Sequence, residues 1–459
     1  MEFVNYQPTK IIFGENKVDS LHKYVLPYGK KVFVIGPILC EPLKPLLSRL
    51  EKALINEVSF HTFYEVESNP STKTVDTALT IMRDFKPDII VGIGGGSSNS
   101  TTTETTSDYV AAGDLKSYTI GTLGPTTGDY AVYGLAVTNA VKLAVEDYNA
   151  ANGTNIKVDV QDSQGDQTQA INIYNKFVTD TKVAGIIGGT VSGESYAIAV
   201  QSKDTGIPMI TPSGTAANIT DEGGANVFRA CYTDPQQAKQ VADFTYETLG
   251  LKKAAIIYNS DDDYSTGVAE AFKAEFESKG GKVVLSEAFS TADQDFSSQL
   301  TKIAASDIDV LFVPNYYEKD VQIAKQARNL GIKAQIVGAD GWDGATSVAG
   351  NDVSAIEDVI FINQYSPDME SVQDILKKYK EKFGTDINSF GINAYDSTML
   401  LLQTIEKVGS LKASDIVKGI ASTDYKGILG SISFDSNGDP IKEPVFVQIK
   451  NGQYTTYKK

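Results

Sequence analysis

Eight polar and aromatic side chains lie where loops follow predicted strands, and their chemistry suits binding of a zwitterion. Hydroxyls and backbone N–H groups can bind a carboxylate, an acidic side chain can bind an ammonium, and tyrosines can enclose an apolar side chain. The set contains no histidine, cysteine or lysine nucleophile, so it favours ligand binding over catalysis. A helix cap or a turn is the alternative role for any single member. The eight residues are Tyr133, Ser192, Ser213, Thr215, Asp234, Tyr264, Tyr316 and Asp340.

A run of glycines after a predicted strand at residues 88–93 is the candidate cofactor-binding turn. Gly94, Gly95, Gly96 and Ser97 could let the backbone approach a pyrophosphate, with a following helix N-terminus supplying N–H donors. The string fails the G-x-G-x-x-G spacing and has no Walker lysine, and the serines and threonines after it lack a helical pattern. We therefore expect no bound cofactor, with NAD as the candidate if the turn is competent.

Residues 1–98 predict an α/β unit of the nucleotide-binding kind, because buried β-branched runs alternate with amphipathic helical patterns. An Asn-Pro-Ser break precedes the last helix, and a Lys-Pro pair ends it. The expected strands cover residues 10–14, 31–36, 58–63 and 88–93, and the expected helices cover 17–25, 45–53 and 72–85.

Residues 99–115 predict a flexible linker, because serine and threonine dominate a stretch with few bulky apolar side chains. Strand–helix units then recur in two successive sets, which predicts two lobes facing each other. We expect the first lobe to comprise about 116–235 and 364–440, and the second about 236–363 and 441–459. The predicted fold class is therefore α/β: a partial Rossmann-like unit, a linker, and two lobes with parallel sheets flanked by helices.

Charge and composition exclude several classes of function. The 459-residue chain has a net charge of −17, which argues against a nucleic-acid partner. Residues 1–98 carry 11 basic and 11 acidic side chains, so the whole excess lies in later residues and supports two modules. Two cysteines and two histidines give no metal-ligand spacing, and we expect no metal site. No apolar run is long enough to span a bilayer. We expect no secretion signal in the chain as written, because no long apolar core follows a basic region at its N-terminus.

Two acidic runs could be mistaken for cation sites. Residues 435–439 begin like an EF-hand loop, but Pro440 stands at its glycine position and Phe446 at its bidentate glutamate position. We predict instead a hairpin turn between strands at 432–434 and 445–449. The run Asp261-Asp262-Asp263 predicts a solvated loop.

The first 98 residues resemble the N-terminal dinucleotide-binding part of iron-containing alcohol and glycerol dehydrogenases. The resemblance is carried by PTKIIFG at 8–14, ESNPS at 67–71 and FKPDIIVGIGGGS at 85–97. Ser100 stands where that family has an aspartate, and the family's metal ligands lie in a later all-helical domain that has no counterpart here. The resemblance therefore implies a truncated cofactor half-site without a catalytic half.

Residues 116–459 resemble the branched-chain amino-acid-binding proteins of ABC importers, which have the type I periplasmic-binding fold. The stretch IGTLGPTTGDYAVYGLAVTNAVKLAVEDYNAANG at 120–153 opens the match. The motifs IPMITPSGT, FRACYTDPQQ, YNSDDDYSTG, PNYYEKD and VGADGW continue it in order. Some relatives have a disulfide near the first-lobe serine. Val191 stands there in this chain, so we expect no bridge.

The same resemblance implies roles for the candidate residues. Ser192 and Thr215 would bind the α-carboxylate of an amino acid with help from the Ser213 backbone, and Asp340 would face the α-ammonium. Asp340 is shorter than the glutamate that relatives often have there. Of the other four, Tyr133 would pack on the ligand side chain, Tyr264 and Tyr316 would close from the second lobe, and Asp234 would lie at the hinge side.

The two resemblances together predict a fusion of two parents, with the crossover within Gly94–Ser98. We expect a monomeric solute receptor, not an enzyme, that delivers an amino acid, leucine, isoleucine or valine, to an ABC permease. The resemblance implies an extracytoplasmic location, in the periplasm or as a surface lipoprotein, whereas the chain as written would stay in the cytoplasm. The alternatives are an NAD-dependent iron-containing dehydrogenase and a sensory ligand-binding domain.

Overall fold

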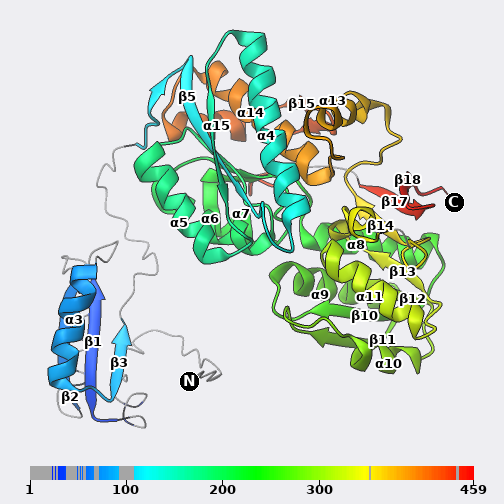
Figure 1. Cartoon of the computed structure of the whole chain (residues 1–459), viewed down its shortest axis with the longest axis horizontal. Helices are drawn as coiled ribbons and strands as arrows, with labels where there is room; N and C mark the ends of the chain where they lie inside the picture. Colours follow the sequence, from blue (N-terminus) through cyan, green and yellow to red (C-terminus); the bar gives the residue numbers. More distant parts are fainter. Residues whose placement is uncertain are drawn as a thin grey trace. The chain divides into compact units, whose positions relative to one another are not determined.

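A computed structural model describes residues 29–37, 58–66, 72–92, 108–350, 353–440 and 444–458, together with residues 23, 26, 49, 52 and 54. The chain divides into two compact units, Met1–Glu104 and Thr105–Lys459 (Figure 1). The predicted elements at 10–14, 17–25 and 45–53 and the glycine turn at Gly94–Ser97 lie outside the continuous described ranges.

The first unit contains a parallel sheet with the strand order β2-β1-β3. The strands are β1 (Lys31–Pro37), β2 (Ser59–Val66) and β3 (Ile89–Gly92), and the helix α3 spans Thr72–Phe85. Alternate residues of β1 point to opposite faces, so Val32 and Val34 lie in one apolar cluster while Phe33 lies in another with Phe63. The three strands and the helix match those predicted for 31–36, 58–63, 88–93 and 72–85.

The second unit has two lobes, each built on its own sheet (Figure 1). The first-lobe sheet has the order β4-β5-β7-β8-β9 with β6 also paired to β5, and all these pairs are parallel except β4–β5. Its strands are β4 (Gly113–Asp114), β5 (Ser117–Gly124), β6 (Lys157–Asp162), β7 (Ile186–Ile187), β8 (Met209–Thr211) and β9 (Val227–Arg229). Its helices are α4 (Ala131–Asn152), α5 (Gln167–Lys176), α6 (Ser192–Thr205), α7 (Asn218–Gly223), α14 (Ser389–Val408) and α15 (Ala413–Ala421).

The second-lobe sheet has the order β11-β10-β12-β13-β14-β17-β18, parallel as far as β14 and antiparallel after it. Its strands are β10 (Lys253–Asn259), β11 (Lys282–Phe289), β12 (Val310–Val313), β13 (Gln335–Gly338), β14 (Ile360–Asn363), β17 (Val445–Lys450) and β18 (Gln453–Thr456). The helices of this part are α8 (Asp234–Asp243), α9 (Asp263–Ser278), α10 (Ser297–Ala304), α11 (Tyr317–Asn329) and α12 (Ala345–Val348). The helix α13 (Gln373–Phe383) follows β14 and contacts α4 of the first lobe.

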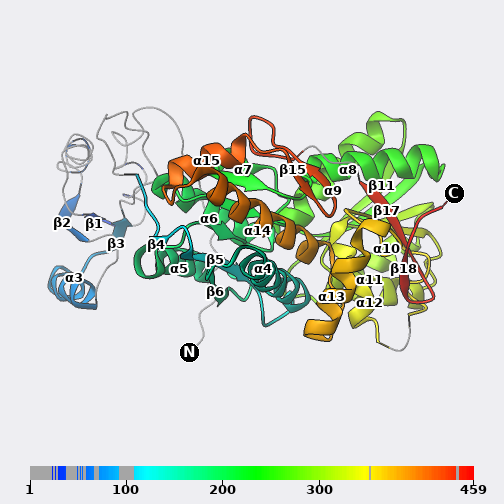
Figure 2. The same cartoon turned by 90° about the horizontal axis from the view of Figure 1, so that it is seen from above.

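The chain passes between the lobes more than once, which ties both halves together. It leaves the first sheet after β9, returns after β14 so that α14 lies against α4, and enters the second sheet again at β17. Figure 2 shows α14 beside α4 in one lobe and β17 beside β18 in the other. Few connections between two rigid bodies are the architecture that permits hinge closure.

The linker predicted at 99–115 ends earlier in the structure than we expected, because residues 108–115 pack on the first lobe. The Tyr109 hydroxyl donates to the carbonyl of Val183 at 3.0 Å, and the Ala413 N–H donates to the Tyr109 carbonyl at 2.8 Å. Ala111 is buried, and β4 pairs with β5. The apolar run Tyr109-Val110-Ala111 interrupts the polar composition and gives this segment surface to bury.

The predicted turn at 435–439 is present, but the strands predicted to flank it do not pair with each other. The Asp435 carboxylate accepts the N–H groups of Asn437 at 2.8 Å and Asp439 at 3.0 Å, so the turn uses this acid internally. β17 instead pairs with β14 and β18, and β16 (Gly430–Ile432) pairs with β15 (Tyr425–Gly427). The partner of β17 is β14, a strand from a distant part of the sequence. A local sequence pattern does not contain this information, so it cannot predict the pairing.

These contacts predict the effect of truncation. A chain that starts at residue 105 should unfold at the same temperature as the second unit of the full protein. A chain that starts at residue 116 should lose about 1–3 kcal/mol of unfolding free energy, since it lacks Tyr109, Ala111 and β4. Urea unfolding followed by circular dichroism measures the difference, and equal stability would contradict the assignment of 108–115 to the folded unit.

Candidate functional site

The candidate residues of both lobes follow the carboxyl ends of parallel strands, where ligands bind in open α/β sheets. In the first lobe, Ser192 opens α6 after β7, and Thr215 follows β8. In the second lobe, Tyr264 lies in the first turn of α9 after β10, Tyr316 precedes α11 after β12, and Asp340 follows β13. The sequence pattern predicted this placement because each residue lies within a few positions after an apolar run.

Hydroxyl and amide groups form one wall of the candidate site in the first lobe. The Ser192 Oγ accepts the N–H groups of Thr215 and Ala216, each at 3.2 Å, and lies 3.5 Å from the Thr215 Oγ1. The structure therefore brings Ser192 and Thr215 together from two different loops. Two backbone N–H groups beside two hydroxyls form a donor set that suits a carboxylate.

Ser213 and Glu194 hold the loops of this wall in place. The Ser213 Oγ donates to the Thr190 carbonyl at 2.6 Å, so its side chain links the two loops. The Glu194 carboxylate accepts the N–H of Val191 at 3.1 Å and the hydroxyl of Ser163. Burial raises the pKa of Glu194 and these hydrogen bonds oppose the rise. Sequence reasoning missed Glu194, although an acid three residues into a helix is a known N-terminal signal.

Two buried acids, Asp234 and Asp340, come together at another corner of the site. They are 2% and 1% exposed, and Gln237 contacts both of them. The Gln237 Nε2 donates to the Asp234 Oδ1 at 3.1 Å, and its Oε1 accepts the Asp340 N–H at 3.3 Å. Sequence reasoning missed Gln237, whose signal is its position one helical turn after Asp234 in α8.

Burial dominates the electrostatics of this corner. It raises the pKa of Asp234 to about 8, with a further rise from the charge of Asp340 and an opposing hydrogen bond from Thr215. It raises the pKa of Asp340 to about 6, against the lowering effect of the Tyr264 and Gln237 side chains. Two acids with such pKa values need a positive group to become fully ionised together.

Several polar atoms at this corner have no protein partner. Within the described part of the chain, neither carboxylate oxygen of Asp340 accepts a hydrogen bond, and the Tyr316 hydroxyl has no partner either. Both side chains are more than nine-tenths buried. Buried polar atoms are normally satisfied, so unpartnered ones in a site are typical of groups reserved for a ligand.

Aromatic side chains fill the space between the lobes. Tyr316 stacks on Tyr264 with ring centroids 4.9 Å apart and lies edge-on to Tyr133 at 5.9 Å. Tyr133 is fully buried, with the ring of Phe390 4.4 Å away. The Tyr133 hydroxyl donates to the Gly341 carbonyl and accepts the Tyr317 N–H at 3.2 Å. Tyr133 therefore joins the two lobes directly, a role that the sequence did not indicate.

Two acids of the run at 261–263 accept backbone hydrogen bonds that stabilise the fold. Asp262 caps α9 by accepting the Ser265 N–H at 2.8 Å, and Asp261 accepts the Thr291 N–H at 3.0 Å. Among the described residues, no cluster of three or more His, Cys, Asp or Glu side chains is placed to hold a metal ion. In the same ranges, no helix is both long and apolar enough to cross a membrane.

Comparison with known proteins now decides the family. Residues 117–453 match the family described as periplasmic binding protein. The chain belongs to this family. Residues 8–103 match the family described as iron-containing alcohol dehydrogenase, a match that extends past the predicted boundary at 98.

The similar proteins share a binding function in their names. The Leu/Ile/Val-binding protein BraC3 of Rhizobium johnstonii is 31% identical over 337 residues, covering 70% of this chain and 88% of that protein. The leucine-binding protein LivK of Thermotoga maritima has a TM-score of 0.69 at 30% identity, covering 74% and 98%. The substrate-binding protein LivJ of Streptococcus pneumoniae in complex with isoleucine has a TM-score of 0.70 at 29% identity, covering 75% and 100%.

The acid corner predicts a pH-dependent stability. The folded-state pKa of Asp234, about 8, lies above its unfolded value. The contribution of protonated Asp234 to the unfolding free energy is therefore fully present below about pH 4, and it is lost as the pH rises to about 8. We expect the unfolding free energy to fall across this window and Asp234→Asn to flatten the fall. Urea titrations at several pH values measure it.

The control for this experiment is Asp424→Asn, which removes one charge from an exposed loop position. It should leave the pH slope close to that of the wild-type protein. An Asp234→Asn variant with the wild-type slope would contradict the raised pKa.

Proposed function

We propose that residues 105–459 capture an amino acid with an aliphatic, branched side chain between the two lobes. The observation that carries the proposal is the buried Asp340 carboxylate, which has no hydrogen-bond partner among the described residues. It lies near a second acid, Asp234, whose neighbour Thr215 belongs to the wall of hydroxyl and amide donors. An anionic corner and a donor wall match the two charged ends of a zwitterion. The tyrosines supply an apolar enclosure.

In the proposed complex, each part of the ligand meets one group of residues. Its carboxylate accepts hydrogen bonds from Ser192, Thr215 and the Ala216 N–H, displacing the contacts among these groups. Its ammonium binds Asp340, with Asp234 close enough to share the charge and Tyr316 closing from the second lobe. The isoleucine in the similar Streptococcus pneumoniae protein supports this class of ligand.

The proposed mechanism is hinge closure without chemistry. A ligand that contacts both lobes favours the closed state by its differential affinity. The contacts of Tyr133 with Gly341 and Tyr317 belong to that closed arrangement. Family membership supports a monomer that works outside the cytoplasm and passes its ligand to an ABC permease.

Calorimetry tests the ligand and the ammonium corner together. We expect one-to-one binding of leucine, isoleucine or valine at micromolar concentration. Asp340→Ala should weaken it by about tenfold or more, since a charged hydrogen bond is worth roughly 1.5–3 kcal/mol. Asp424→Asn should leave the affinity unchanged. Absence of heat with every standard amino acid would refute the function, and an unchanged affinity of Asp340→Ala would refute the role of Asp340.

The second candidate function is an NAD-dependent alcohol or glycerol dehydrogenase, favoured by the match of residues 8–103 alone. We expect no reduction of NAD with glycerol or short alcohols in the presence of iron or zinc. The match reaches only the segment that would hold the dinucleotide. Absorbance of the reduced cofactor measures the activity, and turnover that is lost when residues 1–104 are removed would establish this function.

A further inference from the structure

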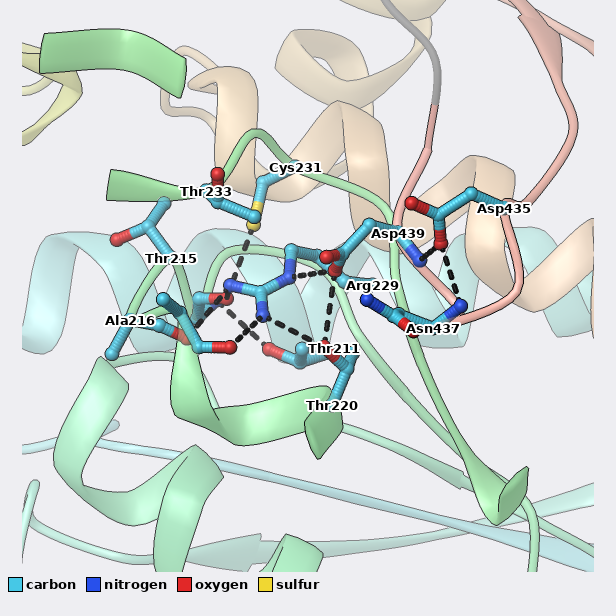
Figure 3. Close-up of polar contacts among 12 residues, drawn as sticks. Thr211, Thr215, Ala216, Thr220, Arg229, Cys231, Thr233, Asp435, Asn437 and Asp439 are labelled. Atoms are coloured by element: carbon cyan, nitrogen blue, oxygen red, sulfur yellow. Dashed lines mark hydrogen bonds and ion pairs between the residues drawn. The ribbon is translucent and has the colours of Figure 1, made fainter. Parts of the chain in front are cut away.

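One buried arginine holds the loop that offers the carboxylate donors. The Arg229 Nη1 donates to the carbonyls of Gly214 at 3.0 Å and Ala216 at 2.9 Å. Its Nη2 donates to the Ala217 carbonyl at 3.3 Å and to the Thr220 Oγ1 at 3.2 Å. Figure 3 shows the guanidinium with Ala216, Thr220 and Asp439 around it. Three carbonyls of one short loop therefore face a single cation.

The orientation of these carbonyls fixes the donors of the loop. The Thr215 carbonyl accepts the Asp234 N–H at 2.8 Å, so every carbonyl from Gly214 to Ala217 has a partner on the protein side. Peptide units are planar, and the N–H of each points opposite to its carbonyl. The Thr215 N–H shares a peptide unit with the Gly214 carbonyl, which Arg229 holds, and the Ala216 N–H shares one with the Thr215 carbonyl, which the Asp234 N–H holds. Both N–H groups consequently face Ser192.

The charge of Arg229 is balanced by an acid from a distant part of the chain. The Nε donates to the Asp439 Oδ1 at 2.7 Å, and the Arg229 side chain is fully buried while that of Asp439 is 14% exposed. Five N–H bonds of the guanidinium thus have partners, which is the full donor set of an arginine. Lysine could not reproduce this fork.

The acid belongs to the turn at 435–439, which packs on β9. The Arg229 N–H donates to the Gly438 carbonyl at 3.0 Å, and the rings of Phe228 and Phe434 lie 5.0 Å apart. The chain leaves for the second lobe just after Arg229 and again after this turn. Two of the interlobe connections therefore begin at the same ion pair.

We propose that the Arg229–Asp439 pair is the positioning device of the carboxylate-binding loop, linking its donor geometry to the hinge. The inference rests on the proposed function, since it assigns a purpose to the Thr215 and Ala216 N–H groups. Arg229 does not touch the ligand in this scheme. It acts by fixing the loop carbonyls, and Asp439 acts by fixing the guanidinium.

A comparison of four variants tests the proposal by calorimetry with leucine, isoleucine and valine. Arg229→Met and Arg229→Lys should each weaken binding by about tenfold or more, because neither side chain can hold three diverging carbonyls. Asp439→Ala should also weaken binding. Asp439→Asn keeps an Oδ1 acceptor for the Nε, so its affinity should stay within about threefold of the wild-type value although it leaves a buried charge unbalanced.

The unfolding free energy of each variant separates positioning from general stability. Phe276→Leu, a core change in the second lobe at a fully buried position, is the matched control. It should lower stability and leave the affinity unchanged. Asp439→Asn should likewise lose stability without losing affinity, whereas the Arg229 variants should lose both. If Arg229 and Asp439 only stabilised the fold, the affinity would fall together with the unfolding free energy in all of these variants.

The outcomes also distinguish the two proposals. A wild-type protein that binds no amino acid would refute the proposed function and the inference that rests on it. Wild-type binding with unchanged affinity in Arg229→Met would refute the inference alone. If Arg229→Met does not fold, Asp439→Ala and Asp439→Asn decide, and equal affinities of these two would overturn the proposal.

Discussion

Two buried carboxylates that raise each other's cost of ionisation are the main constraint on the candidate site. Ionising Asp234 and Asp340 together in a low-dielectric corner is costly. The charge of Arg229 lowers the pKa of Asp234, but this guanidinium is already paired with Asp439. Gln237 contacts both acids but brings no charge. A ligand with an ammonium group relieves this cost, and one that also carries a carboxylate can use the opposite wall. The electrostatics of the protein thus favour one class of solute.

The two lobes contribute different groups to the candidate site. The first lobe offers a wall held by many internal contacts, from the Glu194 carboxylate behind Val191 to the Arg229 guanidinium behind Gly214. The second lobe brings the stacked rings of Tyr264 and Tyr316. Tyr133 bridges them and is buried on all sides. Such a division suits closure by a hinge, because the wall keeps its geometry while the aromatic side moves.

The N-terminal unit has a different character. Its described strands form a parallel sheet of the kind that precedes a dinucleotide turn, and α3 packs beside it. The binding unit has its own core, and among the described residues its first contacts begin at Asp108, whose carboxylate accepts the Ser414 N–H. The match to a dehydrogenase family ends at residue 103 and the match to the binding-protein family begins at 117. The two modules are therefore separate in sequence and in fold.

The sequence alone determined the α/β class, most strands and the loops that carry the candidate residues. These features are local: apolar runs specify strands, and Ser192, Thr215, Tyr264 and Asp340 lie within a few positions after such runs. The tertiary structure decided which of these residues meet. Ser192 touches the Thr215 loop, Tyr133 reaches Gly341, and Arg229 reaches Asp439 more than two hundred positions away. The composition wrongly assigned residues 108–115 to the linker. Their three apolar side chains stabilise a fold only if another part of the protein packs against them, and composition does not show that. Contacts between distant segments depend on the relative placement of whole elements, which no local pattern contains.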